Sequence, residues 1–237
     1  MLSPMSSSPS KSWTVLFDVD GTLVDTGGRG RQAFVRALER ATGVPDDLSY
    51  LSFAGNTDLN VLGLVMSRRR MPLSPDLSRR VFDFVAEELR QALLLNPALE
   101  IPGAGAFLSL LADSGAALGL VTGNVRPCAF LKLASAGLDR HFSFGGFGDD
   151  HPDRSHIARA ALDAAREIGL DPSPGRICLV GDTPFDVAAG RALGIPVLGV
   201  ASGKFSAADL LDAGAAFAVP DLSDAPRLFD WLSFALG

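Results

Sequence analysis

Cysteine and histidine are scarce in this sequence of 237 residues, which has two of the first and three of the second. Cys128 lies in a helical pattern and Cys178 in an apolar strand pattern, so we expect free buried thiols rather than a disulfide or a metal site. His141, His151 and His156 do not have the spacing of a catalytic triad or of a metal site. We therefore assign the histidines to loops and helix surfaces.

Long apolar runs and an excess of positive charge are also missing. No run reaches the length of a membrane span, although 47% of the residues are hydrophobic and can form a sizeable core. The net charge of −6 and a pI near 5.0 argue against nucleic acid or a membrane surface as a partner. Residues 1–12 are rich in Ser and Pro and contain no apolar segment of a signal peptide. We therefore expect a disordered tail at 1–12 and a cytoplasmic protein.

Two acidic residues follow the first apolar segment, residues 13–17, in the run Asp18-Val19-Asp20-Gly21-Thr22. If the strand continues to Asp20, both carboxylates lie on one side, because side chains along a strand alternate. Two anions at such close range repel unless a cation such as Mg²⁺ lies between them. The alternative is a strand that ends in an Asp-rich turn with Asx-type hydrogen bonds.

Strand and helix patterns alternate through the second part of the chain, which predicts a parallel sheet with helices on both faces. The expected strands are 117–121, 142–144, 176–180, 196–200 and 216–219, and the expected helices are 106–113, 126–136, 154–168, 184–193, 207–213 and 225–236.

Residues 25–97 interrupt this alternation with helical patterns alone, at 29–42, from about 56 to the arginine run at 68–70, and at 74–95. The chain therefore divides into a Rossmann-like core, residues 13–24 and 98–237, and an inserted all-helical cap, residues 25–97. A link rich in Pro and Gly, residues 97–105, leads from the cap back to the core.

Two further strands end in polar residues. The first is followed by Thr122-Gly123-Asn124, where a hydroxyl and exposed backbone amides make an anion site, or alternatively a simple capped turn. The second is followed by Gly181-Asp182-Thr183-Pro184-Phe185-Asp186. Asp182 and Asp186 are one helical turn apart and can converge on a hard cation. Alternatively, Asp182 is a helix cap and Asp186 an acid in the first turn.

The sequence as a whole resembles the haloacid dehalogenase-like (HAD) hydrolases, in particular the branch of phosphoglycolate phosphatase and β-phosphoglucomutase. Asp18-Val19-Asp20-Gly21-Thr22 is similar to the first motif of that family, and Gly181-Asp182-Thr183-Pro184-Phe185-Asp186 to the fourth, with Thr122 between them. The resemblance covers residues 13–236. It implies a Rossmann-like core with a helical cap and a Mg²⁺-dependent phosphatase that forms an aspartyl phosphate on a small phosphorylated metabolite.

The resemblance also implies roles for individual residues. Asp18 attacks phosphorus, and Asp20 exchanges protons with the leaving oxygen and with water. Mg²⁺ is bound by Asp18, by Asp20 through its backbone carbonyl and by Asp182. Asp186 orients a metal-bound water or Asp182. The phosphoryl oxygens are held by a set of residues on two later loops, Thr122, Gly123, Asn124 and Arg154.

The third motif of the family is normally a lysine, and here the sequence departs from it. The only lysines are Lys11, Lys132 and Lys204, and the expected segment, residues 145–154, contains none. Arg154 is the best candidate for the role because arginine supplies the charge and binds phosphate through two donors. Lys204 is the reserve candidate. The alternative reading of Arg154 is a surface residue in the first turn of a helix.

Single residues argue against two other activities of the family. The dehalogenases of the family lack the second acid, so Asp20 argues against that activity. Phosphonatases need a cap lysine for a Schiff base, and residues 25–97 contain none. A phosphomutase and a silent binding protein stay open as alternatives, as do monomer and homodimer. The substrate cannot be read, but Arg29, Asn56 and Asp58 are cap residues that can set specificity.

Overall fold

In the part of the chain that the structure describes, six parallel strands form one sheet. The computed structural model describes residues 13–173 and 175–237, so the predicted tail at 1–12 lies outside the described residues. The strand order is β5-β4-β1-β6-β7-β8, and every neighbouring pair is parallel. The strands of this sheet are β1 Thr14–Phe17, β4 Ala117–Val121, β5 Phe144–Gly146, β6 Ile177–Gly181, β7 Val197–Val200 and β8 Phe217–Val219.

The side chains of β1 face two different layers of helices. Val15 and Phe17 pack into one apolar cluster, whereas Leu16 belongs to the cluster on the other face. The first cluster is covered by α4 (Ala104–Asp113), α5 (Arg126–Ser135) and α9 (Ala225–Leu236), and the second by α6 (Arg154–Glu167), α7 (Pro184–Leu193) and α8 (Ala207–Ala213). Helices on both faces of a parallel sheet confirm the predicted Rossmann-like fold class.

The strand order reverses at β1. After β1 the chain builds outward on one side through β4 and β5, and then returns to the other side of β1 for β6, β7 and β8. In open α/β sheets the crevice outside the carboxyl ends of the strands at such a switch point is where ligands bind. The two acidic residues after the first strand therefore lie at the position in this fold that is best suited to a site.

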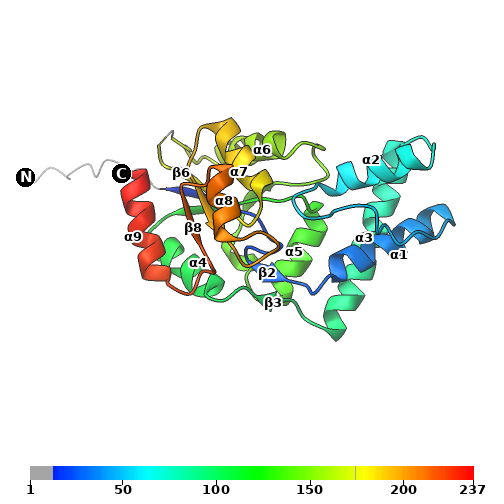
Figure 1. Cartoon of the computed structure of the whole chain (residues 1–237), viewed down its shortest axis with the longest axis horizontal. Coiled ribbons are helices and arrows are strands. Elements are labelled where there is room, and N and C mark those ends of the chain that lie inside the picture. Colours follow the sequence, from blue (N-terminus) through cyan, green and yellow to red (C-terminus); the bar gives the residue numbers. More distant parts are fainter. Residues whose placement is uncertain (1–12, 174) are drawn as a thin grey trace, which may run out of the picture.

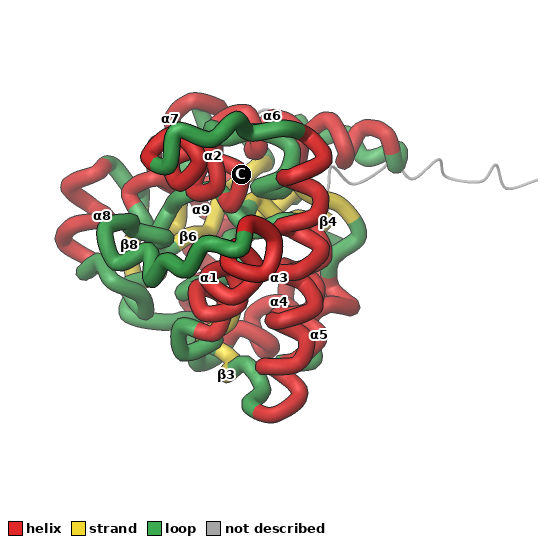
Figure 2. Tube along the Cα trace, turned by 90° about the vertical axis from the view of Figure 1, so that its right-hand side faces the viewer, coloured by secondary structure: helices red, strands yellow, loops and turns green. Residues whose placement is uncertain are grey.

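Three helices from one continuous segment lie at the opposite end of the molecule from α9 (Figure 1). They are α1 (Arg29–Thr42), α2 (Asp58–Arg68) and α3 (Pro75–Leu95). Seen from that end, α1 and α3 lie side by side in front of the sheet (Figure 2), and they make an extensive mutual contact. Thr57 and Ser74 begin α2 and α3 by accepting hydrogen bonds from backbone amides of the first turn. Among the described helices, none is long and apolar enough to cross a membrane.

A short antiparallel pair joins these helices to the sheet. β2 (Val24–Asp25) and β3 (Leu99–Glu100) bring the outgoing and the returning chain side by side. The sequence predicted no strand in either segment, because two-residue strands are too short to show a periodic pattern. The predicted division into a core and a cap stays a prediction, with one of its boundaries, 24/25, inside β2 and the other, 97/98, just before β3.

The structure settles where the first strand ends and displaces one predicted strand. β1 ends at Phe17 and does not continue to Asp20, since the chain turns back at Gly21, whose φ is 73°. Asp20 makes only an isolated bridge to Val24. The predicted strand 142–144 is displaced to Phe144–Gly146, because the glycines expected to form a loop continue the sheet beside β4.

Candidate active site

The carboxyl end of β1 holds a buried carboxylate that is paired with an arginine. Asp18 follows β1 directly, and its backbone N–H donates to the Val180 carbonyl of β6 at 2.9 Å. Its side chain is buried, and its two oxygens lie 3.2 and 3.3 Å from Nη1 and Nη2 of Arg154. A bidentate pair of this kind fixes the orientation of the carboxylate and favours its ionised form.

Arg154 is the first residue of α6, and Asp153 caps that helix by accepting from the Ser155 amide. Only 7% of Arg154 is exposed, and its Nη1 also donates to Asp186 Oδ1. Its interpretation as a surface residue is therefore wrong. The buried Nε of Arg154 has no hydrogen-bond partner among the described residues. An unpartnered buried N–H is costly, so we infer that it faces a position where an acceptor binds.

Asp182 and Asp186 approach Asp18 from the neighbouring strand β6 and helix α7. Thr183, rather than Asp182, caps α7, and Asp186 completes the capping box with it. Asp182 lies in a narrow slot, because a Cβ on Gly21 or on Gly203 would come within 2.3 or 2.1 Å of its Oδ2. One ligand atom of each of the three aspartates falls within 4.8 Å of the others.

The charges of this cluster are not balanced by the protein alone. Burial raises the pKa of Asp18 to about 6 and that of Asp182 to about 8. Repulsion from Asp186 adds to both shifts and repulsion from Asp18 adds to that of Asp182, while Arg154 opposes both. Three buried carboxylates with one guanidinium are an oxygen-rich donor set of the type that Mg²⁺ prefers. Asp186 already accepts from Arg154 and Thr183, which leaves Asp18 and Asp182 with free oxygen lone pairs.

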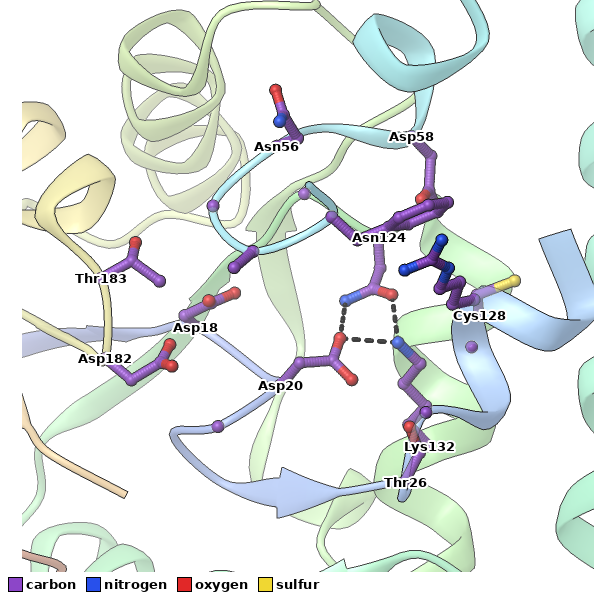
Figure 3. A pocket seen from close by; sticks show the side chains of 18 of the residues that line it. Asp18, Asp20, Thr26, Asn56, Asp58, Asn124, Cys128, Lys132, Asp182 and Thr183 are labelled. Carbon is purple, nitrogen blue, oxygen red and sulfur yellow. Dashed lines mark hydrogen bonds and ion pairs between the residues drawn. The ribbon is translucent and has the colours of Figure 1, made fainter. Parts of the chain in front are cut away.

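Asp20 does not join this cluster with its carboxylate. The condition under which strand alternation would place both acids on one side is not met, because β1 ends before Asp20, although both residues line the same cavity. Figure 3 shows the Asp20 carboxylate directed toward Lys132 and Asn124, with Asp18 and Asp182 on its other side. Lys132 Nζ lies 2.6 Å from Asp20 Oδ2 and 2.5 Å from Asn124 Oδ1.

Lys132 was missed by the sequence-based analysis, although a signal was present. It falls on the buried stripe of α5, four residues after Cys128 and next to Leu133. A lysine among apolar helix positions is unusual unless it is paired. Burial alone would lower the pKa of Lys132, but the charge of Asp20 and its hydrogen bond raise the pKa, so the ammonium form is retained. Lys204, the reserve candidate, is exposed.

The loop after β4 supplies a hydroxyl and an amide side chain. Thr122 is buried, and its Oγ1 accepts from Asn124 Nδ2 at 2.8 Å and from the Asn124 backbone N–H at 3.3 Å. A hydroxyl oxygen that accepts these bonds still has its own hydrogen to donate. The Gly123 carbonyl is already used, since it accepts from the Asp58 amide at 2.8 Å.

The loop at residues 53–58, here called the cap loop, lies directly against the core. A Cβ on Gly123 would come within 2.1 Å of the Asn56 carbonyl oxygen, and one on Gly55 within 2.1 Å of the Phe185 ring. Asp58 Oδ2 accepts from the Val125 amide at 2.8 Å. Asp58, predicted as a specificity residue, is therefore occupied in joining the cap loop to the core.

A cavity of about 260 Å³ lies between this cluster and the cap loop. The predicted specificity residues Asn56 and Asp58 line it, as does Arg31, whereas the predicted specificity residue Arg29 is not among its lining residues. Arg29 instead donates to the Thr26 carbonyl. Lys132, Asp18 and Asp182 also face the cavity, so its wall carries charges of both signs.

We expect Asp58→Asn to change the pH dependence of stability. Burial raises the pKa of Asp58 to about 6 from 3.8, so between these values the folded state binds more protons than the unfolded state. Stability contributed by Asp58 is therefore lost as the pH rises from about 4 to about 6. Asparagine still accepts from the Val125 amide and does not ionise. Its advantage over the wild type should grow by roughly 1–3 kcal/mol across that window, after allowance for partial solvent screening.

Urea unfolding of both proteins at several pH values between 4 and 7 measures this difference. Taking the difference between the two proteins cancels the other titrating groups. A difference that stays constant with pH would show that the carboxylate does not carry an unfavourable buried charge.

Comparison with known proteins identifies the class of this site. A switch-point cluster of aspartates with a buried cation is characteristic of an enzyme rather than of a passive binding surface. The sequence profile of the haloacid dehalogenase-like hydrolases matches residues 14–194. The chain therefore belongs to the haloacid dehalogenase-like hydrolase family, as predicted.

Proteins similar to this chain are named for different activities. A plasmid-encoded phosphoglycolate phosphatase from Cupriavidus necator is 35% identical over 187 residues, which are 77% of this chain and 78% of that protein. Tyrosine-protein kinase PtkA from Mycobacterium tuberculosis is 28% identical over 211 residues, 87% of this chain and 68% of the kinase. The crystal structure of CbbY from Rhodobacter sphaeroides in complex with phosphate is similar with a TM-score of 0.72 at 20% identity, covering 90% of this chain and 96% of that one. At that identity the likeness shows the fold alone.

Proposed function

We propose that the chain is a Mg²⁺-dependent phosphatase that hydrolyses a small phosphate monoester through an aspartyl phosphate. The observation that carries this proposal is the buried Asp18 carboxylate, held by Arg154 and beside Asp182 at the end of the central strand. A held carboxylate is a suitable nucleophile, and a fixed cation beside it stabilises charge that develops on a phosphoryl group. The phosphoglycolate phosphatase relative supports a phosphate ester as the substrate.

The reaction then has two steps. In the first, an Asp18 oxygen bonds to phosphorus while the bond from phosphorus to the leaving oxygen breaks, and Asp20 gives a proton to that oxygen. In the second, Asp20 takes a proton from water as the water oxygen bonds to phosphorus. The bond from Asp18 to phosphorus breaks, and inorganic phosphate leaves. Arg154 and Thr122 hold the phosphoryl oxygens in both steps, with the unpartnered Nε of Arg154 as one donor.

Asp18 and Asp182, with the Asp20 backbone carbonyl, would hold the metal ion. When bound, Mg²⁺ supplies positive charge to the phosphoryl oxygens and to the crowded carboxylates. Asp186 is not one of these ligands. Its role is to fix Arg154 and to complete the capping box of α7.

The cavity favours a small ester. Its volume of about 260 Å³ lies below the range of roughly 300–1,000 Å³ found for sites of drug-sized ligands. The cap loop covers it with backbone packed against Gly123, so the cap also limits the length of the leaving group. 2-Phosphoglycolate is the first substrate to test, because the relative with 35% identity is named for it.

We expect turnover of p-nitrophenyl phosphate to require Mg²⁺. EDTA should abolish it, Mg²⁺ should restore it, and Ca²⁺ should inhibit, because its larger coordination shell misplaces the phosphoryl group. Mg²⁺ should also raise the melting temperature by relieving the repulsion within the cluster, and Asp182→Asn should remove most of that shift. Full activity in thoroughly chelated buffer would refute the metal requirement.

A screen of phosphorylated metabolites identifies the substrate. Release of inorganic phosphate measures hydrolysis, whereas conversion of a sugar phosphate into its isomer without phosphate release would indicate a phosphomutase. A protein that binds phosphate esters but turns none of them over would support the silent binding protein that the sequence left open.

A further inference from the structure

Lys132 is a buried cation outside the motifs that define the family. It projects from the core helix α5 into the cavity, and only 4% of it is exposed. A Cβ on Gly30 of α1 would come within 3.1 Å of its Nζ, so helix α1 of the cap covers the ammonium group. Burying a lysine costs free energy that its partners must offset. Those partners are Asp20 and Asn124, and both belong to the site.

Lys132 determines which way the Asn124 side chain faces. An ammonium group can only donate, so the atom of Asn124 that lies 2.5 Å from Lys132 Nζ must be the oxygen. The amide nitrogen of Asn124 is thereby directed to Asp20 Oδ2 at 2.7 Å and to Thr122 Oγ1 at 2.8 Å. One lysine therefore orients two residues of the reaction, Asp20 directly and Thr122 through Asn124.

The hydrogen bonds of Lys132 and those of Arg154 lie on different sides of the site. Arg154 contacts Asp18 and Asp186, on the side of the nucleophile. Lys132 lies on the other side of Asp20 from Asp18 and Asp182 (Figure 3). Lys132 and Asn124 both bond to Oδ2 of Asp20, which leaves Oδ1 to meet a leaving oxygen.

We propose that Lys132 is the positioning residue of the leaving-group side, which fixes Asp20 and Asn124 so that Asp20 can pass its proton to the leaving oxygen. This inference rests on the proposed phosphatase function. It assigns the phosphoryl side to Arg154 and the leaving-group side to Lys132. Lys132 itself takes no part in bond making, and the proton comes from Asp20 and returns to it from water.

Two aryl esters of similar size test this assignment. Phenyl phosphate releases a strongly basic phenolate that needs a proton, whereas p-nitrophenyl phosphate releases a weakly basic anion that does not. General acid catalysis contributes roughly 10²–10⁴-fold. The leaving group takes part only in the first step, and kcat/KM is set by that step. Lys132→Met should therefore lower kcat/KM for phenyl phosphate by about 10²-fold and kcat/KM for p-nitrophenyl phosphate by less than about 10-fold. Lys132→Arg should restore most of the loss, and Lys204→Met, at an exposed position, is the matched control.

A double variant keeps the test sound if Lys132→Met alone folds poorly. Asp20→Asn/Lys132→Met leaves no unpaired ion of this pair in the site. If Lys132 acts through Asp20, the double variant should be about as slow on phenyl phosphate as Asp20→Asn alone, because residues that act as a unit are not additive. A further large loss in the double variant would overturn the proposal.

The outcomes separate this inference from the function on which it rests. Equal losses of kcat/KM on both esters in Lys132→Met would show a merely structural lysine and overturn the inference alone. Absence of turnover by the wild type with Mg²⁺ on either ester would overturn the proposed function and the inference with it. A loss confined to phenyl phosphate supports both.

Discussion

Asp18→Asn should reduce kcat for p-nitrophenyl phosphate by roughly 10⁴-fold or more, as expected when a covalent nucleophile is removed. Asparagine has the same shape but a weakly nucleophilic amide oxygen, and the 2.9 Å backbone bond to Val180 is unaffected. Arg154 keeps Asp186 as its partner, so it is not left as an isolated buried charge. The loss should therefore appear in chemistry and not in folding.

Stability gives an independent check on the same variant. Burial raises the pKa of Asp18 to about 6, so the ionised carboxylate that predominates at neutral pH costs the folded protein stability relative to the unfolded chain. Removing this charge relieves repulsion with Asp182, and the free energy of unfolding at neutral pH should stay the same or rise. Steady-state kinetics and urea unfolding measure the two effects, with Asp113→Asn at the exposed end of α4 as the control. An Asp18→Asn enzyme that retains more than a few per cent of activity would contradict the assignment of the nucleophile.

The positions of the acidic residues could be predicted from the sequence because they depend on local patterns. An apolar run followed by Asp18, and another followed by Asp182, place both acids at carboxyl ends of strands in any parallel arrangement. Helix starts at Thr57 and Ser74 were readable for the same reason, since capping residues act within one turn. The alternation of strands and helices then fixed the class of fold.

Other features depend on tertiary contacts that no local pattern shows. The direction of the Asp20 side chain follows from a turn at Gly21 and from Lys132, which is 112 positions away in the sequence. Asp58 looked like a free polar residue, but the core amide that it accepts from lies 67 positions further on. The β2–β3 pair was invisible because each strand has two residues. The features that the sequence did not predict are thus concentrated where the cap meets the core.

The prediction about Arg154 depends most on the contacts seen in the structure. Arg154→Ala should lower kcat by about 10²–10³-fold, or ~2.7–4 kcal/mol, the range found on removing one preorganised charge stabiliser. It should also lower the free energy of unfolding in metal-free buffer, because Asp18 and Asp186 are then left buried beside each other without their cation. Mg²⁺ should restore part of that stability by supplying charge to the same carboxylates.

Arg154→Lys separates charge from geometry. A lysine keeps one point charge but loses the planar fork that spans Asp18 and Asp186, and it has no equivalent of Nε. Partial recovery of kcat is therefore expected, together with weaker competitive inhibition by inorganic phosphate than in the wild type. Lys204→Ala should stay close to the wild type in both measurements, since Lys204 is exposed. An inactive Lys204→Ala beside a fully active Arg154→Ala would transfer the phosphate-binding role to Lys204, whereas loss of activity in Arg154→Ala alone assigns that role to the buried guanidinium.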